Sequence, residues 1–257
     1  MVKKIIPFTF ALSAIFFLCG CATLYNSATG RNEVIFINSA SETAIGQSML
    51  PQLTDKHPVL QDSVSQARLQ SVGRRLAQVS DRKDIDYKFS ILTDKELNAV
   101  ALPGGFIYIN KGLFDVINDD QLAYVMGHEV GHVAARHIVK KLQANMAYDA
   151  LLGIVFAGLG SKAGDNAKTV AQGVDMAFSL VELGYSREDE YEADRLGAKY
   201  AYNAGFDPYA ALSALDVIKK VEGQGQKAPI YLRSHPYVDD RINALKNYIP
   251  QLIRKIK

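Results

Sequence analysis

Residues 118–138, with the sequence NDDQLAYVMGHEVGHVAARHI, give the strongest structural signal in this chain. Asn118 followed three residues later by Gln121 is a helix N-cap pair, in which each side chain accepts a hydrogen bond from the other residue's backbone. Apolar residues then recur at helical spacing: Leu122, Val125, Met126, Val130 and Val133. We therefore predict one helix that begins at Asn118, runs to about Ile138 and has a largely apolar surface.

The same helix carries a polar triplet, His128, Glu129 and His132. Residues i and i+4 lie one above the other on a helix, so both imidazoles can reach one metal ion. Two surface histidines are the alternative, but buried polar groups without partners are costly, and a metal supplies the partner. Zinc lowers the pKa of a bound water to about 7, and Glu129 can take its proton as a general base. The triplet predicts a hydrolytic centre with one Zn²⁺ per chain.

Two histidines leave a catalytic zinc one ligand short. No cysteine follows position 21, and His137 comes five residues after His132, which is a poor register for a ligand on a helix. The acidic run at 186–194 offers Glu190 and Asp194 at i and i+4. Glu190 would bind zinc, and Asp194 would accept the N–H of a ligand histidine. Taken alone, however, the run is better explained as an exposed acidic helix face.

The rest of the chain has the pattern of an α+β fold dominated by helices, with a small sheet of three to four strands. Apolar runs and alternation predict a buried strand at 34–37, after a turn at 29–32, and further strands at 87–92, 98–102 and 106–109. Helical spacing predicts helices at 39–50, where Pro51 interferes, at 60–79, and through most of 140–221 and 236–254.

The first twenty residues have the layout of a secretory leader. Lys3 and Lys4 precede an apolar stretch at 5–18 that is short for a bilayer span. The sequence LCGC at 18–21 resembles a bacterial lipobox, which makes Cys21 the lipid-bearing residue and the mature N-terminus. An uncleaved anchor helix is the alternative.

Charge and cysteine content exclude some classes of protein. The 29 basic residues include Lys3 and Lys4, so 27 basic and 27 acidic residues remain once the leader is removed. A balanced surface argues against nucleic acid as a partner. Both cysteines lie at or before position 21, so the mature body forms no internal disulfide.

Several further motifs accompany the triplet. They are TGR at 29–31 with Ser39 and Glu42, NAVALPGG at 98–105, GHEVGH at 127–132, Ser186-Arg187 with Glu190, Ala193 and Asp194, and SHP at 234–236 with Arg241. With these motifs the chain resembles the zinc endopeptidases of the HtpX and CAAX-prenyl-protease type, and within them the secreted branch of BepA-like, LoiP-like and Oma-type proteases. The resemblance covers nearly the whole mature chain.

The resemblance implies a zincin-like catalytic domain in which Glu190 is the third zinc ligand. It divides the chain into a lipoprotein signal peptide at 1–20, a lipidated segment at 21–56 with a strand and a short helix, and a zinc metalloprotease domain at 57–257. It also implies that an edge strand with Asn98, Ala99, Val100 and Ala101 pairs with the extended substrate backbone.

His235 matches a late histidine of the family, and Pro236 would start the helix that carries Arg241. Two roles fit His235. It could donate a hydrogen bond to the oxyanion of the tetrahedral intermediate. It could instead bind zinc as a fourth ligand and keep the enzyme latent until the loop with Gly223, Gly225 and Pro229 moves. We favour latency.

The residues predict a lipid-anchored zinc endopeptidase that faces the periplasm or cell exterior. The resemblance alone implies that it clips misfolded or unassembled envelope proteins. Ala22 after the lipidated cysteine favours the outer membrane if the cell has one. A lipoprotein that acts as a binding or assembly factor with little proteolysis is the alternative.

We expect the apolar run at 151–160 to be a core helix, with a mobile lid or membrane-leaning segment as the alternative. His57 and His137 have no evident partner and are expected to be structural or exposed.

Overall fold

A computed structural model describes residues 23–146, 175–181, 183–222 and 230–256. Four predicted features lie outside these residues: the leader, Cys21, the apolar run at 151–160, and the loop with Gly223, Gly225 and Pro229. Within the described part of the chain, no helix is long and apolar enough to cross a bilayer.

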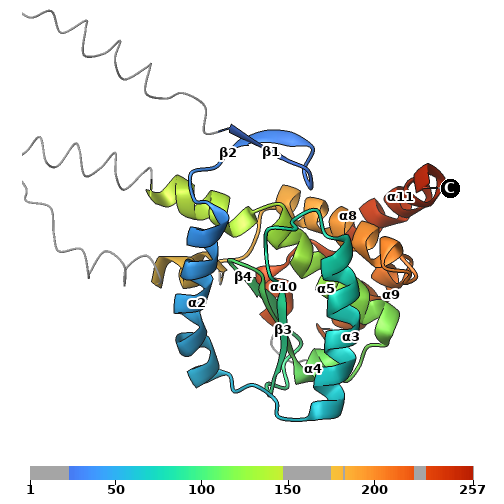
Figure 1. The fold of residues 1–257 in the computed structure, drawn as a ribbon. Helices are drawn as coiled ribbons and strands as arrows, with labels where there is room; N and C mark the ends of the chain where they lie inside the picture. The colour runs from blue at the N-terminus through green and yellow to red at the C-terminus, as the bar shows by residue number, and fades with distance from the viewer. Residues whose placement is uncertain (1–22, 147–174, 182, 223–229, 257) are drawn as a thin grey trace, which may run out of the picture.

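A three-stranded sheet lies at the centre of the fold (Figure 1). Its strands are β3 (Lys88–Leu92), β4 (Ala99–Leu102) and β5 (Phe106–Asn110). Fully buried β5 lies between the other two, parallel to β3 and antiparallel to β4. The turn from β4 to β5 requires Gly104 and Gly105, whose φ angles of 77° and 85° are strained for other residues. Because β5 is its neighbour on one side and no described strand lies on the other, β4 is an edge strand of this sheet.

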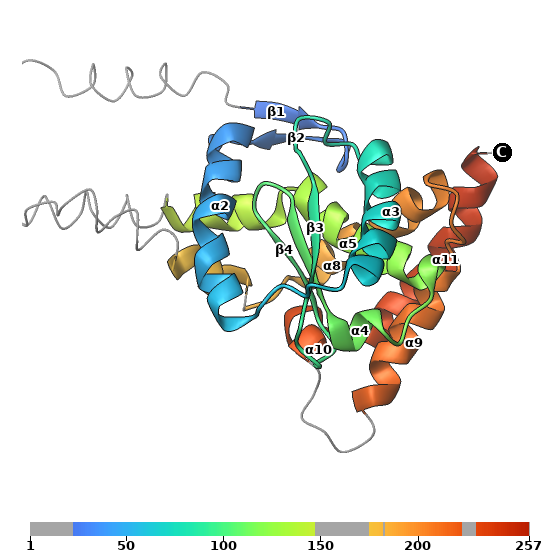
Figure 2. The same ribbon diagram turned by 60° about the horizontal axis from the view of Figure 1, so that its bottom comes forward.

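Helices α3 (Ser63–Val79) and α5 (Asp119–Ala134) cover one face of the sheet. Asp62 caps α3, and the predicted capping box of Asn118 and Gln121 opens α5. On its other side α5 contacts α8 (Arg187–Asn203) and α9 (Ala210–Glu222), and α11 (Val238–Ile256) packs on both (Figures 1 and 2). Since α5 has neighbours all round, every residue from Gln121 to Ala134 is buried. The predicted helix-dominant α+β class is confirmed.

The opposite face of the sheet packs against α2 (Ser39–Lys56) and the helical segments at 137–146 and 175–181. Glu42 holds α2 in place from inside the protein. Its carboxylate accepts hydrogen bonds from Arg82 and Arg136, both at 3.1 Å, and from the backbone N–H of Gly104 at 3.3 Å. One buried acid thus ties α2 to the end of β4 and to the chain just after α5.

The predicted buried strand at 34–37 is wrong. The N-terminal segment instead forms a separate hairpin of β1 (Thr23–Asn26) and β2 (Arg31–Val34), which turns at Gly30. A two-stranded hairpin outside the main sheet has little to pack against, so Val34 is 60% exposed. Of the apolar residues that follow it, Ile37 is buried in the core but Phe36 is exposed.

Two predicted helix ends are also wrong. α2 continues through Pro51 to Lys56, because Met49 and Leu53 on its buried side pack into the core on both sides of the proline. The motif helix ends earlier than predicted, at Ala134, because Arg136 adopts a left-handed backbone with φ of 56°. A new helical segment then begins at 137.

Candidate metal centre

His128, His132, Glu190 and His235 form a buried cluster in which one ligand atom of each lies within 4.8 Å of all the others. The Nε2 atoms of His128 and His132 are 2.9 Å apart, and His235 Nδ1 lies 3.0 Å from Glu190 Oε1. Imidazole nitrogens and a carboxylate are the usual ligands of zinc. A convergent set of such atoms at the centre of a protein fits a metal ion.

Close packing of α5 on α8 brings the cluster together. A Cβ added to Gly197 would lie 2.8 Å from the backbone nitrogen of His128, and one added to Gly127 would lie 2.9 Å from the carbonyl oxygen of Gly197. At Gly131 the corresponding distance to the Ala193 carbonyl is 3.1 Å. The glycines within and around the histidine motif therefore let Glu190, on α8, reach the histidines of α5.

Asp194 orients His128. Its Oδ1 lies 2.9 Å from His128 Nδ1 and also accepts a hydrogen bond from the Tyr124 hydroxyl at 2.7 Å. Burial alone would raise the pKa of Asp194, but Arg241 and the other hydrogen bonds outweigh it and lower the pKa to about 2. The charged carboxylate keeps the proton of His128 on Nδ1 and leaves Nε2 free to bind metal.

Arg241 is fully buried and holds three parts of the site together. It makes two hydrogen bonds to Asp194, at 2.7 and 2.9 Å, and an ion pair of 2.8 Å with Glu190 Oε2. It also donates to the backbone carbonyl of His235 at 3.2 Å. Burial raises the pKa of Glu190, yet Arg241 and His235 hold it well below its usual range, so Glu190 is charged. Sequence analysis noted Arg241 within a motif but assigned it no role.

His132 is oriented by another histidine, His137, and the sequence did not indicate this contact. His137 is buried, and its Nδ1 lies 2.7 Å from His132 Nδ1. With a metal on Nε2, His132 carries its proton on Nδ1, so His137 accepts there and donates through Nε2 to Glu192 at 3.3 Å. Arg31 of β2 completes the chain with hydrogen bonds of 2.9 and 3.0 Å to the Glu192 carboxylate.

His137 therefore has a partner that the sequence did not reveal, and the reason is local. A continuous helix would carry position 137 away from His132. Because the helix ends at Ala134 and Arg136 is left-handed, the backbone turns His137 back toward it. His57 also has a partner, since its Nδ1 lies 2.9 Å from Asp94 Oδ1, but it takes no part in the cluster.

Glu129 is fully buried beside the cluster, with neither carboxylate oxygen hydrogen-bonded to any described group. Its closest charged neighbour is His235, whose Nε2 lies 3.5 Å from Glu129 Oε1. Burial raises the pKa of Glu129. A buried carboxylate without a partner is costly, and a bound water next to a metal is the kind of group that would satisfy it.

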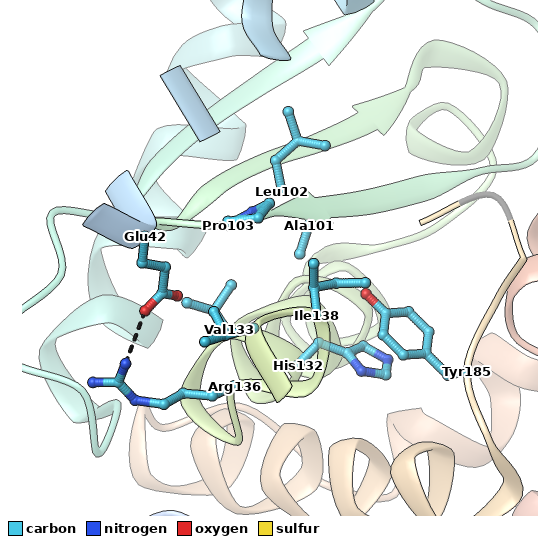
Figure 3. A pocket seen from close by; sticks show the side chains of 10 residues that line it. Glu42, Ala101, Leu102, Pro103, His132, Val133, Arg136, Ile138 and Tyr185 are labelled. Carbon is cyan, nitrogen blue, oxygen red and sulfur yellow. Dashed lines mark hydrogen bonds and ion pairs between the residues drawn. The ribbon is translucent and has the colours of Figure 1, made fainter. Parts of the chain in front are cut away.

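Aromatic rings and the edge strand border the cluster. The Tyr185 ring stacks on His132 at a centroid distance of 3.6 Å, and Tyr231 stacks on His235 at 4.4 Å. Figure 3 shows the small pocket where His132 and Tyr185 lie next to Ala101 of β4. His235 directly follows the short helix α10 (Ile230–Ser234), and α11 starts at Val238, two residues later than predicted.

Comparison with known proteins assigns the chain to a family. Residues 63–249 match Peptidase family M48. Similar proteins include the putative beta-barrel assembly-enhancing protease of Vibrio cholerae, 29% identical over 205 residues, which cover 78% of this chain and 42% of that protein. The mitochondrial metalloendopeptidase OMA1 of Schizosaccharomyces pombe is 30% identical over 179 residues, which cover 69% and 51%.

The metalloprotease LoiP of Escherichia coli is 23% identical over 250 residues, which cover 95% of this chain and 96% of LoiP. The chain thus spans about half, or less, of the first two relatives but nearly all of the third. Since the family match covers most of the chain and includes all four clustered residues, this protein belongs to Peptidase family M48.

Proposed function

We propose that this protein is a zinc endopeptidase of the bacterial cell envelope that cleaves misfolded or unassembled envelope proteins. One observation carries the proposal: the buried carboxylate of Glu129, which has no hydrogen bond to any described group, lies beside a convergent cluster of three histidines and a charged glutamate. A pure binding factor has no use for a general base in this place. The relative from Vibrio cholerae is named a putative beta-barrel assembly-enhancing protease, and this name supports the bacterial envelope as the setting.

In this proposal His128, His132 and Glu190 hold one zinc ion, which when bound supplies an activated water. Glu129 takes the proton of that water and passes it to the leaving amine. The raised pKa of Glu129 makes it a stronger base than an exposed glutamate. Asp194 and Arg241 keep His128 and Glu190 in the right protonation state while the reaction proceeds.

No described strand pairs with the outer edge of β4, and this edge is the proposed site for the substrate backbone. The N–H of Asn110 donates to the carbonyl of Asn98 at 2.9 Å, so 98, 100 and 102 are the positions that bond to β5. The backbone groups of Ala99 and Ala101 therefore point to the free edge. An extended peptide can pair with them next to His132, where Ala101 borders the cluster.

His235 is proposed to keep the enzyme latent. Its Nδ1 lies 3.0 Å from Glu190 Oε1 and 3.2 Å from His128 Nε2, within the ligand cluster. A histidine there would take the coordination position that water needs for hydrolysis. The oxyanion role would require His235 to move out of the cluster toward the substrate.

Lipid on Cys21 is proposed to hold the enzyme at the periplasmic face of the membrane, on the grounds of the lipobox-like sequence. A Cys21→Ser variant tests this, because it should no longer incorporate labelled fatty acid.

Proteolysis is tested with casein, whose hydrolysis should stop with a chelator and return with zinc. Substrates can be captured in native envelopes on a Glu129→Gln trap. Binding of envelope proteins without any chelator-sensitive cleavage would favour the assembly-factor alternative.

A further inference from the structure

A second and larger cavity, of about 520 Å³, lies on the side of β4 that faces away from α5. Its walls come from α2, from β4, from the helical segment at 175–181 and from the end of α10. This volume is within the range of about 300 to 1,000 Å³ that is usual for ligand sites. Nothing in the proposed hydrolytic mechanism uses it.

The three residues Asn98, Val100 and Leu102 line this cavity together. They share one face of the strand, because side chains alternate along it. The intervening Ala99 and Ala101 point to the other face, where they are buried in the core against α5. One face of β4 is thus closed by core packing, and the other opens into the cavity.

A peptide that adds to the free edge of β4 continues the sheet and keeps its alternation. Every second side chain of that peptide must therefore point to the face of Val100, and so into the cavity. On the opposite face Ala99 and Ala101 are buried in the core, where β4 packs against α5. We propose that this cavity is a specificity pocket for the substrate strand, and that it selects bulky uncharged side chains. This inference rests on the proposed endopeptidase function.

The position of the cavity places the pocket close to the bond that is cleaved. Leu102 lines both the cavity and the small pocket that contains His132. At the other end, Ser234 lines the cavity and is followed directly by His235. Residues next to the candidate metal ligands therefore flank the pocket on two sides. Substrate side chains near the scissile bond can reach it.

The walls explain the chemical selectivity. Apolar side chains supply much of the surface: Leu53, Leu92, Val100, Leu102, Phe178 and Val181. Exposed Lys56 and Arg233 also line the cavity and disfavour a basic side chain. Asp94 Oδ2 and Asn98 Oδ1 are buried acceptors without a hydrogen-bond partner among the described groups, and they disfavour a carboxylate. A large uncharged residue avoids like-charge repulsion from either set of groups and buries apolar area, and one with a hydroxyl, such as Tyr, can also donate a hydrogen bond to these acceptors.

The test is a series of quenched fluorescent peptides that vary one position at a time on both sides of the cleaved bond. The purified protein in detergent, loaded with zinc, should prefer Leu, Phe or Tyr over Ser, Asp or Lys at one such position by about tenfold or more in kcat/KM. Val100→Trp fills the cavity from β4 and should shift the preference at that position to small residues. Gln52→Trp narrows it from α2 without altering the edge strand, and should shift the preference in the same direction.

Val64→Trp is the matched control, because Val64 is 77% exposed on α3 and lies outside the cavity. It should keep the wild-type preference. If the wild type cleaves peptides but has no preference at any position, or if both cavity variants keep the wild-type preference, the pocket is overturned while the protease stands. If the zinc-loaded wild type cleaves no peptide and no casein, the proposed function itself fails, and the pocket fails with it.

Discussion

Gly197 on α8 lies directly against the backbone of His128 on α5, so closely that a Cβ at position 197 would come within 2.8 Å of the His128 nitrogen. The cluster of candidate metal ligands, His128, His132, Glu190 and His235, depends on this contact. Glu190 and Asp194 occupy the same helix as Gly197, about two turns and one turn before it respectively, and they reach the histidines only while the two helices remain this close.

We expect Gly197→Ala to weaken zinc binding more than it weakens the fold. The added methyl must push α8 away from backbone atoms that cannot yield, so Glu190 and Asp194 both withdraw from the histidines. Zinc affinity measured by competition with a chromogenic chelator should fall by at least tenfold. Gly205→Ala, at the end of α8, is the control: its φ of 80° makes it strained by about 1 kcal/mol, but its zinc affinity should match the wild type.

Glu129→Gln and Glu190→Ala should separate the base from the ligand. Both remove a buried carboxylate at the cluster, but only Glu190 is assigned to the metal. Glu129→Gln should abolish casein cleavage and retain about one zinc per chain, whereas Glu190→Ala should lose zinc and with it stability, since metal binding is coupled to folding. Metal analysis and casein assays on the same preparations check this. Full zinc occupancy in Glu190→Ala would show that another carboxylate is the ligand.

His235→Ala should raise the rate of casein hydrolysis, because it removes the side chain that fills the ligand cluster. The measurement is the rate per bound zinc, so that metal loss is not mistaken for loss of activity. An oxyanion donor would behave in the opposite way, since its removal costs about 3 kcal/mol, or roughly a hundredfold in rate. An unchanged rate would assign His235 a structural role only.

His137→Ala should lower zinc affinity by about 10- to 100-fold, which is the usual effect of removing a partner of a ligand histidine. The physical reason is that His132 loses the acceptor that keeps its Nε2 directed at the metal. Arg31→Ala should produce a smaller loss in the same direction, because it acts only through Glu192 and His137. His57→Ala is the matched control and should leave affinity unchanged. If His137→Ala lowers the melting temperature of the zinc-free protein but not zinc affinity, His137 only supports the fold.

Local patterns predicted much of the fold. The capping residues at Asn118 and Gln121, the periodicity of α3 and the alternation in β3 depend on neighbours in sequence, and all three are confirmed. The end of α5 was not predictable in this way. The left-handed Arg136 is held by a buried carboxylate, Glu42, which lies 94 residues away in the chain. Such a contact leaves no periodic signal.

The candidate site, too, could be predicted only in part from local patterns. Spacing on a helix pointed to His128 and His132, and the resemblance pointed to Glu190, which the acidic run alone left undecided. The residues that orient the candidate metal ligands were not predicted from the sequence. Arg241 and Glu192 look like ordinary surface charges in the sequence, and they are assigned only when tertiary packing buries them beside the histidines.

The order of the site residues along the chain has a consequence for timing. His128 and His132 belong to α5, but Glu190 comes with α8, and Arg241, which neutralises Glu190, comes with α11. A polypeptide is made from its N-terminus, so the histidines are synthesised well before the residues that complete the cluster. A nascent chain therefore carries an incomplete hydrolytic centre until it has been extended past residue 241. The site can therefore form only after the C-terminal helices have been synthesised and have packed against α5 and α8.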